Sequence, residues 1–174
     1  IKNPTGGHFD YARQGTSTTH NLQKILTKLE ESYHVFTTQT GFGSVFLAIF
    51  SLVRPGDEIL VSDPVYSPTR VLTQNFLKEF NIKTVFYDPH NLKTLQKNIT
   101  SKTKLIFVEN PGSNTFDFQD LNKIISIAKK NKAILIFDEI TSGFKDCYGG
   151  LHLKYKVNPD IAIFGKSIGC LLYT

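Results

Sequence analysis

Residues 104–139 read KLIFVENPGSNTFDFQDLNKIISIAKKNKAILIFDE, and this stretch decides the fold. Two runs, 104–108 and 133–137, are almost wholly apolar, which is typical of strands buried on both faces. Between them, 117–131 carries apolar residues at helical spacing, and Asp117 is a suitable helix cap. A strand, a helix and a second strand of this kind form a βαβ unit, so the sequence predicts a parallel sheet.

The alternation of strands and helices continues on both sides of this unit. The further expected elements are strands 58–62, 83–87 and 161–164 and helices 21–33, 42–53, 66–80 and 91–99. Helix 21–33 is amphipathic, and helix 42–53 is apolar nearly all round, which predicts a buried position. The fold class is therefore α/β, a three-layer α/β/α arrangement around a mostly parallel sheet. At 174 residues we expect one domain, with 1–35 as an N-terminal arm and helix and 36–174 as the large domain.

The composition excludes several classes of protein. Hydrophobic residues make up 40% of the chain and aromatic residues 12%, too much for a disordered chain. No apolar run reaches the roughly 18 residues of a membrane-spanning helix, and the N-terminus does not resemble a signal peptide. The net charge of +5 comes mainly from Lys, whereas proteins that recognise the bases of nucleic acids rely on Arg. We therefore expect a cytoplasmic protein without nucleic-acid or membrane partners. Cys147 and Cys170 match no metal-binding spacing and are expected to be free thiols.

Polar side chains follow the predicted strands where ligands of doubly wound folds bind, beyond the carboxyl ends. Tyr66 follows strand 58–62, Asp138 follows strand 133–137, and Lys166 follows strand 161–164. A glycine-rich turn, TQTGFGS (38–44), opens the buried helix and offers backbone N–H groups to an anion. Pyridoxal phosphate needs this combination: donors for its phosphate, a Lys for its aldehyde, a carboxylate for its ring nitrogen and an aromatic ring for its face. No metal is expected.

Four stretches in order resemble the Cys/Met-metabolism family of pyridoxal-phosphate-dependent enzymes. They are YARQGTST (11–18), TGFGSV (40–45), RPGDEILVSDPVYSPT (54–69) and KLIFVENPGSNTFDFQDL (104–121). The resemblance covers about 9–138 and is closest to the bacterial cystathionine β-lyase branch, which Gly112 and Ser113 favour. It implies that Gly41 and Phe42 bind the cofactor phosphate through backbone N–H groups and that Tyr66 stacks on the cofactor ring. It also implies that Tyr11 and Arg13 reach the phosphate of a partner subunit.

From 137 onward the chain resembles a second family. The segment FDEITSGFKDCYGGLHLKYKVNPDIAIFGKSIG (137–169) is similar to class III aminotransferases of the glutamate-1-semialdehyde aminomutase type. That resemblance implies that Asp138 binds the pyridine nitrogen and that Lys166 binds the aldehyde. The two lie 166 − 138 = 28 residues apart, which suits the class III pattern. The chain is accordingly interpreted as composite or rearranged.

The resemblances imply a lyase of sulfur amino acid metabolism that splits cystathionine into homocysteine, pyruvate and ammonia. Two alternatives stay open: a fragment of a class III aminotransferase or aminomutase, and a non-catalytic remnant of such an enzyme. Both families continue into a C-terminal small domain that carries the Arg for the substrate carboxylate. No segment of this chain resembles that domain, so we expect it to be missing. The complete family members imply a homo-oligomer, a dimer or a tetramer.

Overall fold

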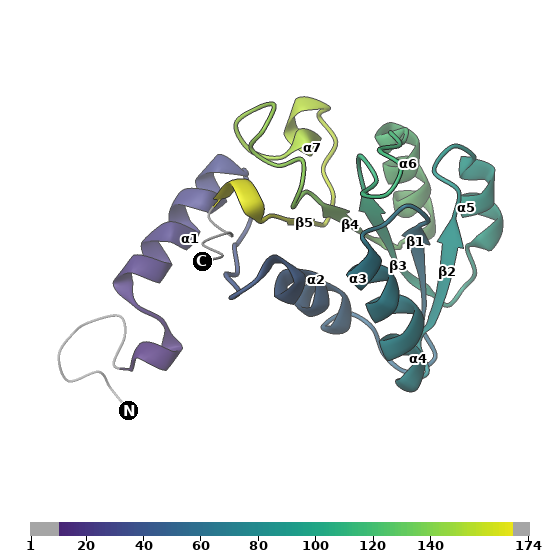
Figure 1. The fold of residues 1–174 in the computed structure, drawn as a ribbon, viewed down its shortest axis with the longest axis horizontal. Coiled ribbons are helices and arrows are strands. Elements are labelled where there is room, and N and C mark those ends of the chain that lie inside the picture. Colours follow the sequence, from purple (N-terminus) through teal and green to yellow (C-terminus); the bar gives the residue numbers. More distant parts are fainter. Residues whose placement is uncertain (1–10, 169–174) are drawn as a thin grey trace. The chain divides into compact units, whose positions relative to one another are not determined.

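The structure, a computed structural model, describes residues 11–168 (Figure 1). The chain divides into two compact units, Ile1–Gln39 and Thr40–Thr174. The second unit contains the whole sheet and most of the predicted site. Cys170 lies outside the described residues, and Cys147 is a free thiol. In the part of the chain that is described, no helix is long and apolar enough to cross a membrane.

The first unit holds a short turn, η1 (Ala12–Gln14), and one longer helix, α1 (Ser17–Leu29). The predicted limits of 21–33 are wrong at both ends. The helix starts earlier because the Thr16 hydroxyl caps it, accepting a hydrogen bond from the Thr19 N–H at 3.2 Å. It ends earlier because Glu31 adopts a left-handed φ of 48°. The apolar side chains Leu22, Ile25 and Leu29 are 43–56% exposed.

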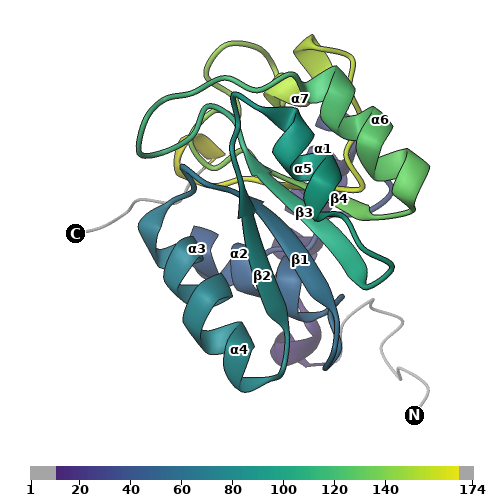
Figure 2. The same cartoon turned by 90° about the vertical axis from the view of Figure 1, so that its right-hand side faces the viewer.

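The sheet has five parallel strands in the order β2-β1-β3-β4-β5 (Figures 1 and 2). The strands are β1 (Glu58–Ser62), β2 (Lys83–Tyr87), β3 (Thr103–Glu109), β4 (Ile134–Asp138) and β5 (Ile161–Ile163). Each lies within one residue of its predicted limits. The sheet is parallel because its apolar strands alternate with helices that return the chain to the same edge.

Helices cover both faces of the sheet, which confirms the three-layer prediction. On one face, α2 (Gly41–Phe50) and the helical run α3 (Ser67–Val71), η2 (Leu72–Phe76) and α4 (Leu77–Glu79) lie over a core that includes Ile59, Val61, Leu105, Phe107 and Ile136. On the other face, α5 (Leu92–Asn98) and α6 (Leu121–Asn131) lie over Leu60, Ile106, Val108, Leu135 and Phe137. Residues of one strand therefore alternate between the two cores.

Two helix predictions need correction. Helix α2 ends at Phe50 instead of residue 53, and it buries only the side facing the sheet, while Phe42 and Leu47 are exposed. Helix α6 begins at Leu121 instead of residue 117. Its cap is Asp120, whose Oδ1 accepts from the Lys123 N–H at 3.0 Å.

Asp117 has a different role from the predicted one. Its carboxylate accepts from the Thr115 hydroxyl, and its Oδ1 lies 2.8 Å from Nε2 of His90. A short helix not predicted from the sequence, α7 (Leu151–Lys154), precedes β5, and the turn η3 (Lys166–Ile168) follows it.

Candidate active site

The start of α2 and the segment after β5 meet at the carboxyl edge of the sheet. A Cβ atom placed on Gly165 would stand 3.8 Å from the Cα of Gly41 and 3.3 Å from Ile140 Cγ2. A Cβ atom on Gly41 would stand 3.2 Å from Ile140 Cδ1. Ile140 comes just after the end of β4, so three segments far apart in sequence pack together here. The absence of side chains on both glycines allows this close approach.

The first turn of α2 presents backbone donors at this edge. The Thr40 hydroxyl accepts from the Gly43 N–H at 2.9 Å, and the Thr40 carbonyl accepts from the Ser44 N–H at 3.1 Å. The N–H groups of Gly41 and Phe42 come before these, where no residue of the helix can accept from them. Together with the positive end of the helix dipole, they suit an anion such as a phosphate.

Asp138 ends β4 and is 4% exposed. Its Oδ1 accepts from the Ile140 N–H at 3.0 Å. Burial, reinforced by the negative charge of Glu109, raises the pKa of Asp138 to about 7, and the positive charge of Lys166 opposes that rise. Asp138 is thus a buried carboxyl group that loses its proton only near neutral pH, and it lies close enough to the Lys166 amine to interact with its charge.

Lys166 begins η3, directly after Gly165, and has a left-handed φ of 45°. Its side chain is exposed, and its Nζ donates to the Thr141 hydroxyl at 2.8 Å. Thr141 lies three residues after Asp138, so this hydrogen bond directs the amine toward the end of β4. The structure therefore brings Lys166, Asp138 and the start of α2 to one edge.

Tyr66 is held at this edge by its backbone. It is the residue before α3, and its N–H donates to Glu109 Oε2 at 2.7 Å. The Ser113 hydroxyl donates to the other oxygen of the same carboxylate. The Tyr66 side chain is 48% exposed, so its ring is open to a ligand.

Glu109 is a site residue that reasoning from the sequence missed. It ends β3 and is 3% exposed, and burial raises its pKa. The sequence does contain a feature that could have identified it, because Glu109 directly follows a buried apolar run, just as Asp138 does. Its importance depends on pairing between β3 and β4, which the sequence does not display.

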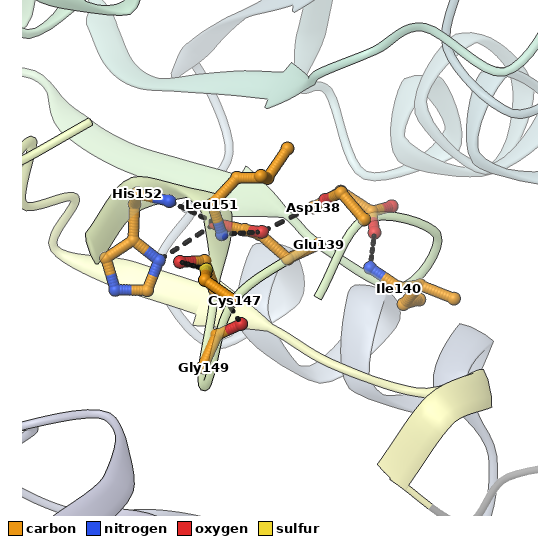
Figure 3. A network of polar contacts seen from close by, with 9 residues as sticks. Asp138, Glu139, Ile140, Cys147, Gly149, Leu151 and His152 are labelled. Atoms are coloured by element: carbon orange, nitrogen blue, oxygen red, sulfur yellow. Dashed lines mark hydrogen bonds and ion pairs between the residues drawn. The ribbon is translucent and has the colours of Figure 1, made fainter. Parts of the chain in front are cut away.

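The neighbouring carboxylate, Glu139, points away from Asp138 and toward Leu151 and His152 (Figure 3). It accepts from the N–H groups of Leu151 and His152 at 2.7 and 2.9 Å, from the His152 ring at 2.8 Å and from the Ser142 hydroxyl at 3.0 Å. Burial alone would raise the pKa of Glu139, but the hydrogen bonds from His152 and Leu151 outweigh it and hold that pKa below its ordinary value. These four hydrogen bonds to Glu139, called the Glu139 network below, anchor the loop between β4 and α7.

Tyr11 and Arg13 lie in the first unit, where the Arg13 guanidinium stands 4.9 Å from the centroid of the Tyr11 ring. Two further arginines have local partners in the second unit. Arg70 pairs with Asp63 at 2.6 Å and lies over the Phe86 ring at 3.9 Å. Arg54 donates to the carbonyls of Ser51 and Val53, beyond the end of α2.

A model of the family described as Cys/Met metabolism PLP-dependent enzyme matches residues 2–145. The chain belongs to this family. A Saccharomyces cerevisiae protein provisionally named a cystathionine beta-lyase is 38% identical over 132 residues, 76% of this chain and 38% of that protein. A Haemophilus influenzae cystathionine beta-lyase is 32% identical over 136 residues, 78% of this chain and 34% of that protein.

A solved structure shows the same relationship. It is a Campylobacter jejuni protein provisionally named an O-acetylhomoserine (thiol)-lyase, which holds N'-pyridoxyl-lysine-5'-monophosphate. It is 31% identical to this chain, and the two align with a TM-score of 0.69 over 74% of this chain and 32% of that one. The large-domain fold of fold-type-I enzymes is thereby confirmed for about three-quarters of this chain, and the family's cofactor is pyridoxal phosphate. The chain spans about a third of the length of the relatives it matches. Lys166 lies beyond residue 145, where the family match ends.

Proposed function

We propose that this chain belongs to a pyridoxal-phosphate-dependent carbon–sulfur lyase that splits cystathionine into homocysteine, pyruvate and ammonia. The contact between Gly165 and Gly41 carries the proposal, because it places the Lys166 segment beside the start of α2. The motif Gly112-Ser113 and the two relatives named as cystathionine beta-lyases support this substrate class.

The donor set at the carboxyl edge fits the cofactor. The N–H groups of Gly41 and Phe42 would hold its phosphate, Lys166 its aldehyde carbon and Asp138 its ring nitrogen, while the Tyr66 ring would lie on its face. Bound pyridoxal phosphate supplies an electron sink, which allows bonds beside the substrate amino group to break.

The chain's own residues would move the protons. Lys166 Nζ would accept the substrate α-proton, and the Thr141 hydroxyl, 2.8 Å away, would hold the amine in place. Asp138, 4% exposed, would pair with a protonated ring nitrogen in a site with little competing water. Tyr11 and Arg13 would complete the phosphate site of a partner subunit, so the whole enzyme would be a homo-oligomer. We propose that this enzyme acts in the cytoplasm.

A class III aminotransferase or aminomutase fragment is the second candidate. It is favoured by the sequence of 137–169, in which Asp138 and Lys166 carry the roles that the class III resemblance implies. The two candidates differ in their products. Elimination releases pyruvate and ammonia from cystathionine. An aminotransferase instead passes the amino group to a keto acid, an aminomutase moves it within one molecule, and neither releases ammonia.

The test is the visible absorption band that the purified full chain develops with pyridoxal phosphate. We expect Lys166→Ala to abolish the band and Lys145→Ala, a change at an exposed Lys of the same unit, to leave it. Equal loss in both variants would mean adventitious surface chemistry and would overturn the proposal. A retained band with no pyruvate and no amino transfer would identify the non-catalytic alternative.

A further inference from the structure

The turn after β1 is held by the loop that follows β3, its neighbour in the sheet. A Cβ atom on Gly112 would stand 2.7 Å from Pro64 Cγ, so the lack of a side chain lets the loop and the turn pack this closely. The Asn114 N–H donates to the Pro64 carbonyl at 3.3 Å, and the Asn114 side-chain amide donates to the Val65 carbonyl at 3.1 Å. Asn114 therefore holds two successive carbonyls of the turn that leads to Tyr66.

The peptide bond between Val65 and Tyr66 is held at both ends. Its carbonyl accepts from Asn114, and its N–H donates to Glu109 Oε2 at 2.7 Å. A trans peptide unit is planar, with its carbonyl and its N–H pointing in opposite directions, so these two bonds fix the orientation of the plane. The Tyr66 carbonyl in turn accepts from the Arg70 N–H at 3.0 Å. Both peptide planes beside the Tyr66 Cα are thus held, and with them the direction of its side chain.

The two ends of this peptide bond are held by different kinds of residue. Glu109 ends β3 and is 3% exposed, and its carboxylate also accepts from the Ser113 hydroxyl. Asn114, in contrast, lies in an exposed part of the loop. Removing the Asn114 side chain should therefore release the carbonyl end of the peptide bond while leaving the buried end and the core intact.

We propose that Asn114 is a positioning residue that directs the Tyr66 ring toward the face of the bound cofactor. The Tyr66 side chain is 48% exposed, so its direction depends on the held backbone more than on burial of the ring. A ring that is already in place loses little conformational freedom when the ligand binds, and this increases affinity. The inference rests on the proposed function, in which Tyr66 lies on the cofactor, and adds the residue that keeps it there.

Hydrogen exchange of the Tyr66 N–H, measured by NMR in the full chain without cofactor, tests the hold on the peptide bond. In Asn114→Ala we expect exchange to become about two- to tenfold faster, the factor that one hydrogen bond contributes to a closed state. Asn131→Ala is the matched control, because it also removes a side-chain amide that donates to a backbone carbonyl, that of Ile127 at 2.8 Å. It should leave the Tyr66 exchange rate unchanged. Equal rates in the two variants would overturn the proposal.

Asn114→Asp gives a second measurement should Asn114→Ala fail to fold. The substitution keeps the size of the side chain but removes the donor to the Val65 carbonyl. We expect the same faster exchange of the Tyr66 N–H. An exchange rate equal to that of the unmodified chain would mean that the Asn114 amide does not hold this peptide bond, and would overturn the proposal.

The affinity for pyridoxal phosphate tests whether Asn114 acts through the Tyr66 ring. Asn114→Ala should weaken binding by about two- to tenfold, the factor that an aromatic stack contributes. In the Tyr66→Ala background the same change should cost nothing further, because no ring remains to be directed. A merely structural role of Asn114 would weaken binding equally in both backgrounds, and that result would overturn the proposal.

Failure of this proposal can be told apart from failure of the proposed function. Equal loss of the visible band in Lys166→Ala and Lys145→Ala would overturn the proposed function, whereas hydrogen exchange uses no cofactor and would still report on Asn114. A band that depends on Lys166, together with an unchanged Tyr66 exchange rate in Asn114→Ala, would overturn the role of Asn114 alone.

Discussion

Gly165 packs against Gly41, close enough that a Cβ atom on Gly165 would stand 3.8 Å from the Gly41 Cα. The first residue precedes the candidate cofactor lysine, and the second opens the candidate phosphate-binding helix. Ile140, just beyond Asp138, touches both. Three parts of the proposed site are therefore fixed relative to one another by van der Waals packing.

Gly41→Ala should separate ligand binding from stability. Ala is the better helix former by up to about 1 kcal/mol, which offsets the strain of a tight contact with Ile140, so the melting temperature should change little. The added methyl group would stand 3.2 Å from Ile140 Cδ1, beside the N–H groups offered to the phosphate. We expect an affinity for pyridoxal phosphate that is weaker by about tenfold, the equivalent of one charge-assisted hydrogen bond. Gly43→Ala is the matched control, because the Gly43 N–H is already bound by Thr40. An equal loss in both variants would show a general effect on the helix.

Asp138→Asn should stabilise the cofactor-free protein at high pH. The folded pKa of about 7 exceeds the ordinary value of 3.8, so between these values the folded chain binds more protons than the unfolded one. The free energy of unfolding therefore falls as pH rises from about 4 to 7. Asp138→Asn should therefore raise the free energy of unfolding by at most about 4 kcal/mol at pH 8, at about 1.4 kcal/mol for each unit of the pKa difference. At pH 4 it should raise that free energy by almost nothing. Urea unfolding at several pH values measures this, and a gain that does not depend on pH would refute it.

Glu139→Ala should destabilise the protein strongly. The substitution leaves the Leu151 N–H, the His152 N–H and the His152 ring without their buried acceptor. Each buried donor left without a partner costs about 1–3 kcal/mol, so the free energy of unfolding should fall by at least about 3 kcal/mol. Asp146→Ala is the control, because Asp146 pairs with Lys154 at the surface, and its melting temperature should hardly change. Similar melting temperatures for both variants would mean that the Glu139 network does not fasten the loop before α7.

The chain alone should release pyruvate from cystathionine slowly, even with cofactor bound. Elimination requires the substrate to be oriented by its carboxylate, and good orientation can lower a barrier by about 7–11 kcal/mol. In the second unit, Arg70 is engaged by Asp63, and Arg54 is engaged by backbone carbonyls beyond the end of α2. A steady-state assay with added pyridoxal phosphate checks this. Turnover within the usual range of about 1–10³ per second would show that the chain orients its substrate by other means.

The strands were predictable from local pattern, whereas the start of α6 was not. Both Asp117 and Asp120 are acceptable caps, and the choice between them depends on Gln119. Its side chain accepts from the Tyr87 hydroxyl at 2.8 Å and donates to the Glu109 carbonyl at 3.0 Å. These bonds to β2 and β3 keep 117–120 out of the helix, and they involve residues distant in sequence. In the same way, the predicted burial of α2 fails on its outer side because one face of a helix suffices to cover the sheet.

The sequence alone determined the parallel sheet, the family and the candidates Asp138 and Lys166, because each depends on residues adjacent along the chain. Strand apolarity, helical spacing and short motifs are all local properties. Only the tertiary structure decided which carboxyl groups face one another. Successive residues of a strand point to opposite faces, so Glu139 turns away from Asp138, its neighbour in sequence. The pairing of β3 with β4 brings Glu109 to Asp138 instead, because register is set by packing between strands.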